Sequence, residues 1–86
     1  MKRKILIVED SLTVRRMLTQ AISQQTGLEI DAFDTLEGAR VCQGEEYVVA
    51  LVELTLPGAP SGEAVNVLLE HGLPVVILTA DISEEK

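Results

Sequence analysis

The sequence is short of cysteine, aromatic residues and positive charge, and each shortage excludes a class of protein. Cys42 is the single cysteine, so no disulfide can form within the chain, and a reducing cytoplasmic location is expected. Seven basic residues stand against 14 acidic ones, which gives a formal net charge of −7. This charge repels a phosphate backbone, so we expect no direct binding of nucleic acid.

Long apolar runs are also absent. A transmembrane helix needs about 20 apolar residues, and no run in this sequence approaches that length, so no membrane association is predicted. The basic residues 2–4 precede only four apolar residues before Glu9 and Asp10, which argues against a signal peptide. Because Phe33 and Tyr47 are the only aromatic residues, we expect an aliphatic core of the kind found in layered α/β proteins.

Short apolar runs predict four β-strands. Residues 4–8, the run from Tyr47 to Glu53 and residues 75–78 are almost continuously apolar, which is typical of strands buried on both faces. Residues 28–33 instead alternate between apolar and acidic side chains, which predicts an edge strand.

Three helices are predicted between these strands. The first begins at Asp10 or Ser11 as its N-cap and ends at Gly27, the second runs from residue 34 or 35 to about 43, and the third covers residues 63–71. Residues 81–86 resemble the start of another helix. Two apolar stripes are expected to be buried: Val14, Met17, Leu18, Ala21 and Ile22 on the first helix, and Ala64, Val65, Val67, Leu68 and Leu69 on the third.

This alternation predicts an α/β fold with a parallel sheet and helices on both faces. In such sheets ligands bind beyond the carboxyl ends of the strands. Glu9 and Asp10, Glu53, and Thr79 each follow or end a predicted strand, so we expect them to meet at this edge.

Glu53 raises the question of why a carboxylate ends a buried apolar strand. Carboxylates are costly to bury unless they are paired or bind a metal, so Glu53 marks either a solvated strand end or a cation site. Three carboxylates and a hydroxyl at one edge suit a hard cation such as Mg²⁺, which takes one or two carboxylates together with water and phosphate oxygens. The alternative is that Asp10 caps a helix while Glu9 and Glu53 face water.

Four segments, taken in order, resemble the receiver domain of two-component response regulators. They are Lys-Ile-Leu-Ile-Val-Glu-Asp-Ser, Leu-Val-Glu-Leu-Thr-Leu-Pro-Gly, Ser-Gly-Glu-Ala and Pro-Val-Val-Ile-Leu-Thr-Ala. The resemblance covers the whole chain. It implies a doubly wound parallel sheet of the flavodoxin-like type, here with four strands in the order 2-1-3-4 and three helices. It also implies transfer of a phosphoryl group from a histidine kinase to an aspartate at the end of the third strand, assisted by Mg²⁺.

The resemblance assigns roles to individual residues. Glu9 and Asp10 match the acidic pair that holds Mg²⁺, and Thr55 matches the position whose backbone carbonyl also contacts the ion. Glu53 stands at the phospho-acceptor position and contributes to the same metal site. Thr79 matches the hydroxyl that turns toward the phosphoryl group, and Ala80 matches the small residue beside it.

The sequence departs from the family pattern in two places. Glu53 replaces the acceptor aspartate, and residues 1–86 are expected to form only the N-terminal portion of a receiver, ending before the fifth strand and its lysine. The extra methylene of glutamate moves the carboxylate by about 1.3 to 1.5 Å. A misplacement near 1 Å can cost about a hundredfold in an oriented reaction. We therefore predict a receiver that accepts phosphate poorly. We do not expect it to be an enzyme.

Two other functions stay open at this point: an active phospho-acceptor, and a dimerisation module with a vestigial acidic site. The resemblance implies a histidine kinase and an output domain as partners, and an uncovered fourth strand would allow self-association. A flavin or nucleotide binder is disfavoured because the loop after the first strand has no glycine to admit a phosphate.

Overall fold

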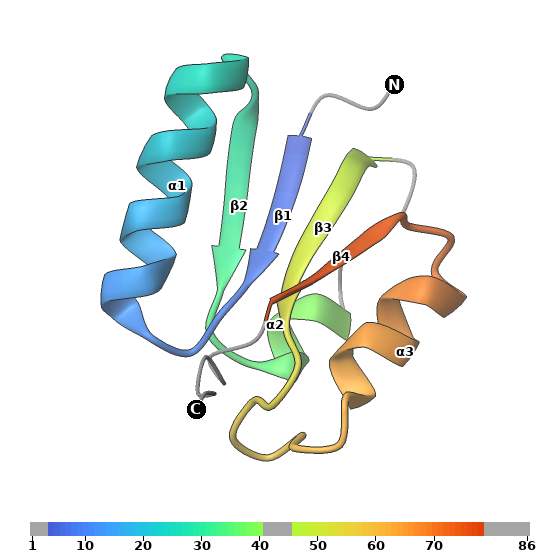
Figure 1. The fold of residues 1–86 in the computed structure, drawn as a ribbon. Helices are drawn as coiled ribbons and strands as arrows, with labels where there is room; N and C mark the ends of the chain where they lie inside the picture. Colours follow the sequence, from blue (N-terminus) through green and yellow to red (C-terminus); the bar gives the residue numbers. More distant parts are fainter. Residues whose placement is uncertain (1–3, 41–45, 79–86) are drawn as a thin grey trace, which may run out of the picture.

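Strands and helices alternate along the chain in the computed structural model, which describes residues 4–40 and 46–78. The strands within these ranges are β1 (Lys4–Val8), β2 (Glu29–Phe33), β3 (Tyr47–Glu53) and β4 (Val75–Leu78) (Figure 1). The helices are α1 (Leu12–Thr26), α2 (Leu36–Arg40) and α3 (Glu63–Glu70). The predicted order of elements is confirmed, whereas the helix start at residues 81–86 lies outside the described residues, as does the predicted end of the second helix.

The strands form one parallel sheet in the order β2-β1-β3-β4. This order confirms the doubly wound architecture and places β2 at one edge, as its alternating sequence predicts. β1 lies between two neighbours, and every residue from Ile5 to Val8 is buried. All four strands end at the lower side of the sheet in Figure 1, which we call the carboxyl edge.

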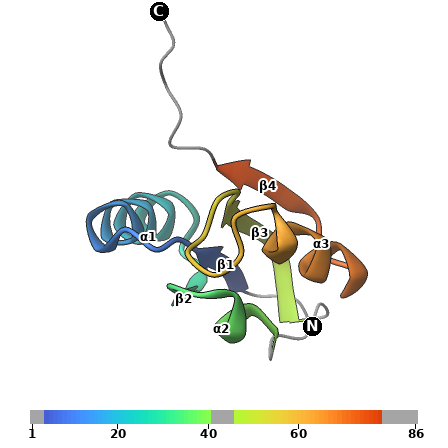
Figure 2. The same ribbon diagram turned by 90° about the horizontal axis from the view of Figure 1, so that it is seen from below.

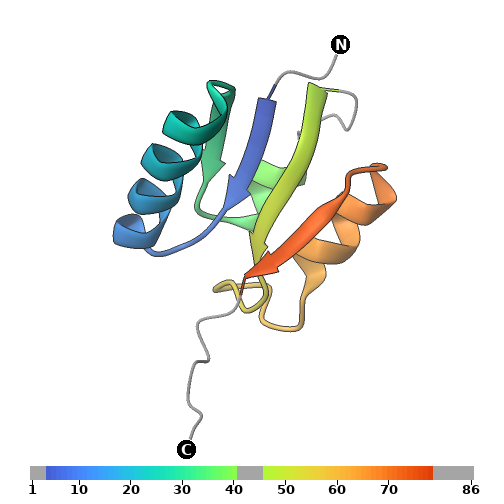
Figure 3. The ribbon, with the colours of Figure 1, turned by 45° about the horizontal axis from the view of Figure 1, so that its top comes forward.

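Helices cover the two faces of the sheet unequally. α2 and α3 contact each other and pack on one face, while α1 lies on the opposite face against β2 and β1 (Figure 2). In Figure 3, α1 lies beside β2 at one side of the sheet and α3 lies beside β4 at the other. Within the described residues, the face that α1 occupies is therefore covered by a helix only on its β1 and β2 side.

The hydrophobic core lies between the sheet and the pair α2 and α3. Side chains from β1 and β3 meet the buried side of α3 there, and Leu68 is fully buried at the centre of that side. The prediction for α3 is confirmed at Ala64, Val65 and Leu68 but is wrong at Leu69, which is 54% exposed. An apolar residue beside the buried stripe of a helix looks the same in sequence whether or not a neighbour covers it.

The predicted burial of α1 is wrong. The helix forms as expected, with Ser11 as N-cap and Gly27 in the left-handed conformation at its end, but none of its residues is buried. Met17 is 61% exposed, and Leu18 and Ile22 are half-buried. Periodicity reveals that a helix has an apolar face, but the amount of sheet beneath that face depends on the tertiary packing.

In the described part of the chain, no helix has the length and apolar character needed to cross a membrane.

Polar contacts join three strands at the amino edge, where the strands begin. Lys4 Nζ lies 3.0 Å from Asp31 Oδ2 and 3.4 Å from Glu46 Oε1. The Tyr47 hydroxyl donates to the same Asp31 oxygen at 2.7 Å. The hydrogen bond from Tyr47, joined by that from Lys4, holds the pKa of Asp31 below its usual value. The hydrogen bond to Asp31 raises the pKa of Lys4. Lys4 therefore belongs to the edge opposite the predicted site.

Candidate functional site

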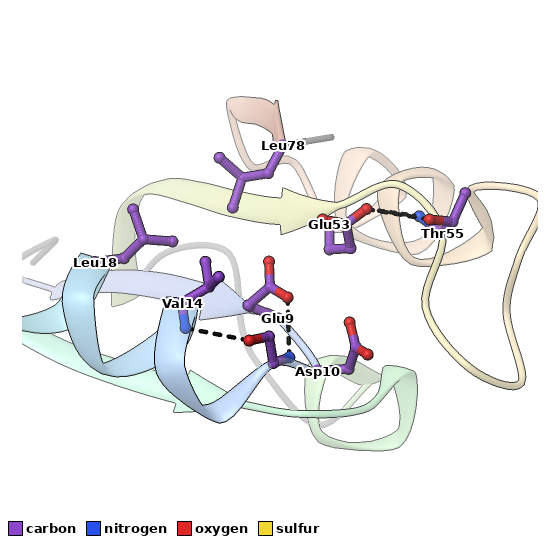
Figure 4. Close-up of a pocket in the computed structure, with 8 residues that line it drawn as sticks. Glu9, Asp10, Val14, Leu18, Glu53, Thr55 and Leu78 are labelled. Carbon is purple, nitrogen blue, oxygen red and sulfur yellow. Dashed lines mark hydrogen bonds between the residues drawn. The ribbon is translucent and has the colours of Figure 1, made fainter. Parts of the chain in front are cut away.

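A pocket of about 580 Å³ opens at the carboxyl edge, where β1, β3 and β4 end (Figure 4). Its polar side comes from the ends of β1 and β3, and its apolar side comes from α1 and the end of β4. The lining residues are Glu9, Asp10, Ser11, Val14, Leu18, Glu53, Thr55 and Leu78. The structure thus brings together all three predicted carboxylates and Thr55, whereas Thr79 and Ala80 lie outside the described residues.

The two glutamates of the pocket are buried. The exposed fraction is 5% for Glu9 and 4% for Glu53, while Asp10 is exposed. The alternative in which Glu9 and Glu53 face water at solvated strand ends is therefore wrong. Buried carboxylates require compensating partners, so the hydrogen bonds of these two side chains decide what the pocket can do.

Both glutamates use the same local contact. Glu9 Oε2 accepts a hydrogen bond from the backbone N–H of Ser11 at 3.0 Å, and Glu53 Oε2 accepts one from the backbone N–H of Thr55 at 3.3 Å. Each carboxylate therefore accepts a hydrogen bond from the loop residue two positions further along the chain (Figure 4). The hydroxyls differ: Ser11 Oγ accepts from Val14 N and caps α1, whereas Thr55 Oγ1 donates to Glu53 Oε2 at 3.2 Å.

Burial raises the pKa of Glu9 above its ordinary value. The hydrogen bond from Ser11 opposes this shift, and the negative charges of Glu53 and Asp10 add to it. An acid with a raised pKa in the folded state opposes folding once it is ionised, so Glu9 reduces stability as the pH rises from its unfolded pKa through its folded pKa. A cation bound in the pocket would remove part of this cost.

The donor set fits a hard cation in its chemistry. The Glu9 carboxyl also interacts with the Asp10 side chain. Within the described residues, the second carboxylate oxygen of Glu53 accepts no hydrogen bond, and no basic side chain lines the pocket. No three acidic, histidine or cysteine side chains of the described part of the chain lie close enough together to hold one metal ion. Mg²⁺ commonly uses one or two carboxylates with water, so the arrangement suits an ion held by fewer protein ligands than the sequence predicts.

Sequence reasoning missed the contributions of Ser11 and of the apolar wall. Ser11 was expected only as a helix cap, and Val14 and Leu18 only as core residues. The position of Ser11 two residues after Glu9, matched by Thr55 two residues after Glu53, was the available signal. The Arg15 guanidinium also approaches the site, since its Nη1 donates to the backbone oxygen of Glu9 at 2.8 Å.

The chain is similar to several response regulators. Its sequence is 87% identical to that of a two-component system response regulator/GGDEF domain protein with a crystal structure. The two structures align with a TM-score of 0.88 over 96% of this chain and 34% of that one. A second structure of this description is 84% identical, with a TM-score of 0.88 over 95% of this chain and 34% of that one. The structure of the response regulator StyR, at 24% identity and a TM-score of 0.79, shares the fold.

A curated relative is also similar. The transcriptional regulatory protein TctD of Salmonella typhimurium strain SL1344 is 32% identical over 80 residues, which cover 90% of this chain and 35% of TctD. No protein-family model matches the chain. The chain spans about a third of the length of TctD and of the two most similar structures reported above. The strand order, the acidic carboxyl edge and these likenesses agree, and the chain belongs to the receiver domains of two-component response regulators.

Proposed function

We propose that residues 1–86 form the N-terminal portion of a receiver whose phosphoryl acceptance is impaired by Glu53. The observation that carries this proposal is the state of the Glu53 carboxylate, which is buried and turned back onto Thr55 by two hydrogen bonds. Acceptance requires a carboxylate oxygen to form a bond to phosphorus while the bond from phosphorus to the kinase histidine breaks. A carboxylate displaced by one methylene and held by its own loop is poorly placed for this attack.

In this proposal the carboxyl-edge pocket is also the site of the Mg²⁺ ion that assists phosphoryl transfer. Glu9, Asp10 and the backbone carbonyl of Thr55 would hold Mg²⁺, with Glu53 beside them. A bound Mg²⁺ would neutralise charge on the phosphoryl oxygens. The buried carboxylate of Glu9, whose pKa is raised, supports a cation at this position. Thr79 and Ala80 are proposed as the hydroxyl and the small residue that complete the site.

The test is phosphorylation by a small acyl phosphate in the presence of Mg²⁺, followed by intact mass. The unaltered chain should form the adduct much more slowly than Glu53→Asp, because aspartate restores the reach of the acceptor. We expect about a hundredfold difference in the rate of adduct formation. An adduct on the unaltered chain at the rate of Glu53→Asp would favour the active phospho-acceptor. No adduct on either would favour a vestigial site.

The similar proteins support a proposal for the partners. The structure that is 87% identical belongs to a protein with a GGDEF domain, and we propose an output domain of that kind for the longer protein. A histidine kinase is the proposed phosphoryl donor. We propose no catalytic turnover for the receiver itself and a cytoplasmic location for the protein.

Self-association through β4 is a second candidate function, favoured by the exposure of that strand. β4 is an edge of the sheet, and Val76 and Ile77 are 50% and 52% exposed. An apolar edge strand of this kind is a template for pairing with a second copy. Light scattering should show a dimer that Val76→Lys converts to a monomer. A monomer at every concentration of the unaltered chain would contradict this candidate.

A further inference from the structure

The two buried glutamates of the pocket are held differently, although they occupy equivalent strand ends. Each accepts the backbone N–H of the residue two positions further on. Only Glu53 also accepts a side-chain hydroxyl, because the Ser11 hydroxyl caps α1 while the Thr55 hydroxyl donates to Glu53. Thr55 therefore adds a contact that the fold does not require at this kind of position.

We infer that Thr55 is a positioning residue that holds Glu53 on the loop side of the pocket and so limits its part in binding a divalent cation. The inference rests on the proposed function, because it concerns the same cation. Both donors of Thr55 converge on one oxygen, Glu53 Oε2, and in Figure 4 the carboxylate of Glu53 is directed toward Thr55. An ion that uses this oxygen must compete with the hydroxyl.

The geometry sets the size of the effect. The donor–acceptor distances of 3.3 and 3.2 Å are longer than the usual 2.9 Å or less, so each bond is weaker than an ideal one to a carboxylate. Thr55 is itself exposed, so its hydroxyl can turn to water when released. Loss of the hydroxyl leaves only the long backbone hydrogen bond of 3.3 Å, which we expect to be too weak to hold Glu53 in one rotamer.

Thr55→Val tests the inference because valine keeps the branched shape and removes the hydroxyl. Calorimetric titration with Mg²⁺ should give a dissociation constant about three- to tenfold lower for Thr55→Val than for the unaltered chain. Thr55→Ser keeps a hydroxyl and should stay within about twofold of the unaltered chain. Thr13→Val, an exposed threonine on α1, is the matched control and should leave the constant unchanged.

A second measurement does not depend on the cation. Side-chain coupling constants of Glu53, measured by NMR without metal, should report one dominant rotamer in the unaltered chain, in Thr55→Ser and in Thr13→Val, and averaging in Thr55→Val. A single Glu53 rotamer in Thr55→Val overturns the inference, as does unchanged or weaker Mg²⁺ binding. If no variant binds Mg²⁺, the proposed cation fails, and the rotamer measurement alone decides the role of Thr55.

Discussion

Leu68→Ala should lower the free energy of unfolding by about 2–5 kcal/mol. Leu68 is fully buried where α3 meets the sheet, so the shorter side chain loses its transfer free energy and leaves a cavity that the surrounding core fills only in part. A domain of this size has a total stability on the order of 5–15 kcal/mol, and the change therefore removes a large share of it. Urea denaturation followed by circular dichroism measures the loss.

Leu69→Ala is the matched control, because the two leucines are neighbours on the same helix. Leu69 is 54% exposed, so its truncation creates no cavity and should change stability by no more than about 0.5 kcal/mol. Equal losses for the two variants would mean that α3 presents a different face to the sheet, or that another molecule covers Leu69 in solution.

Gly38→Ala should destabilise the fold by about 1–3 kcal/mol, although alanine is the better helix former. A Cβ atom at Gly38 would lie 2.5 Å from Phe33 Cδ1, 2.6 Å from Cγ and 2.8 Å from Cβ. The Cβ and Cγ atoms of Phe33 lie close to its backbone, so they cannot move away from the new methyl group without a shift of β2. Thermal unfolding should therefore show a lower midpoint than for the unaltered chain.

A double-mutant cycle with Phe33→Ala checks the cause of this loss. Removing the ring eliminates the two shortest contacts and leaves only the Cβ contact at 2.8 Å. The cost of Gly38→Ala should then be smaller in the Phe33→Ala background than alone. Equal costs in both backgrounds would attribute the loss to the remaining Cβ contact or to the backbone of α2, and not to the ring.

The strands were predictable, because continuous apolar runs and helix periodicity carry that information locally, whereas their order in the sheet was expected from the resemblance to receiver domains. The apolar patterns also placed Glu9 and Glu53 at strand ends on the same edge of the sheet. The burial of these glutamates was not predictable, since it depends on how the loops fold back over the strand ends. The contact from Thr55 to Glu53 depends on side-chain rotamers, which leave no periodic signal in a sequence.

The exposure of Met17 and Leu69 escaped prediction for a related reason. Apolar periodicity describes one helix at a time, whereas burial is a property of two surfaces in contact. α1 has sheet beneath only part of its apolar face, and Leu69 lies next to a buried stripe without belonging to it. Both residues were indistinguishable from core residues until their neighbours were placed.

The two ends of the sheet respond to acid in opposite ways, because the contacts among Lys4, Asp31 and Tyr47 lower the pKa of Asp31 while burial raises the pKa of Glu9. Asp31 has a lowered pKa, so its contribution to stability is present above its unfolded pKa and is lost as the pH falls through the folded value. Glu9 at the other end has a raised pKa, so acid relieves its charge and favours the folded state there. Mild acid therefore removes the unfavourable charge of Glu9 at the pocket. Stronger acid then removes the stabilising charge of Asp31, which weakens the contacts between β1, β2 and β3.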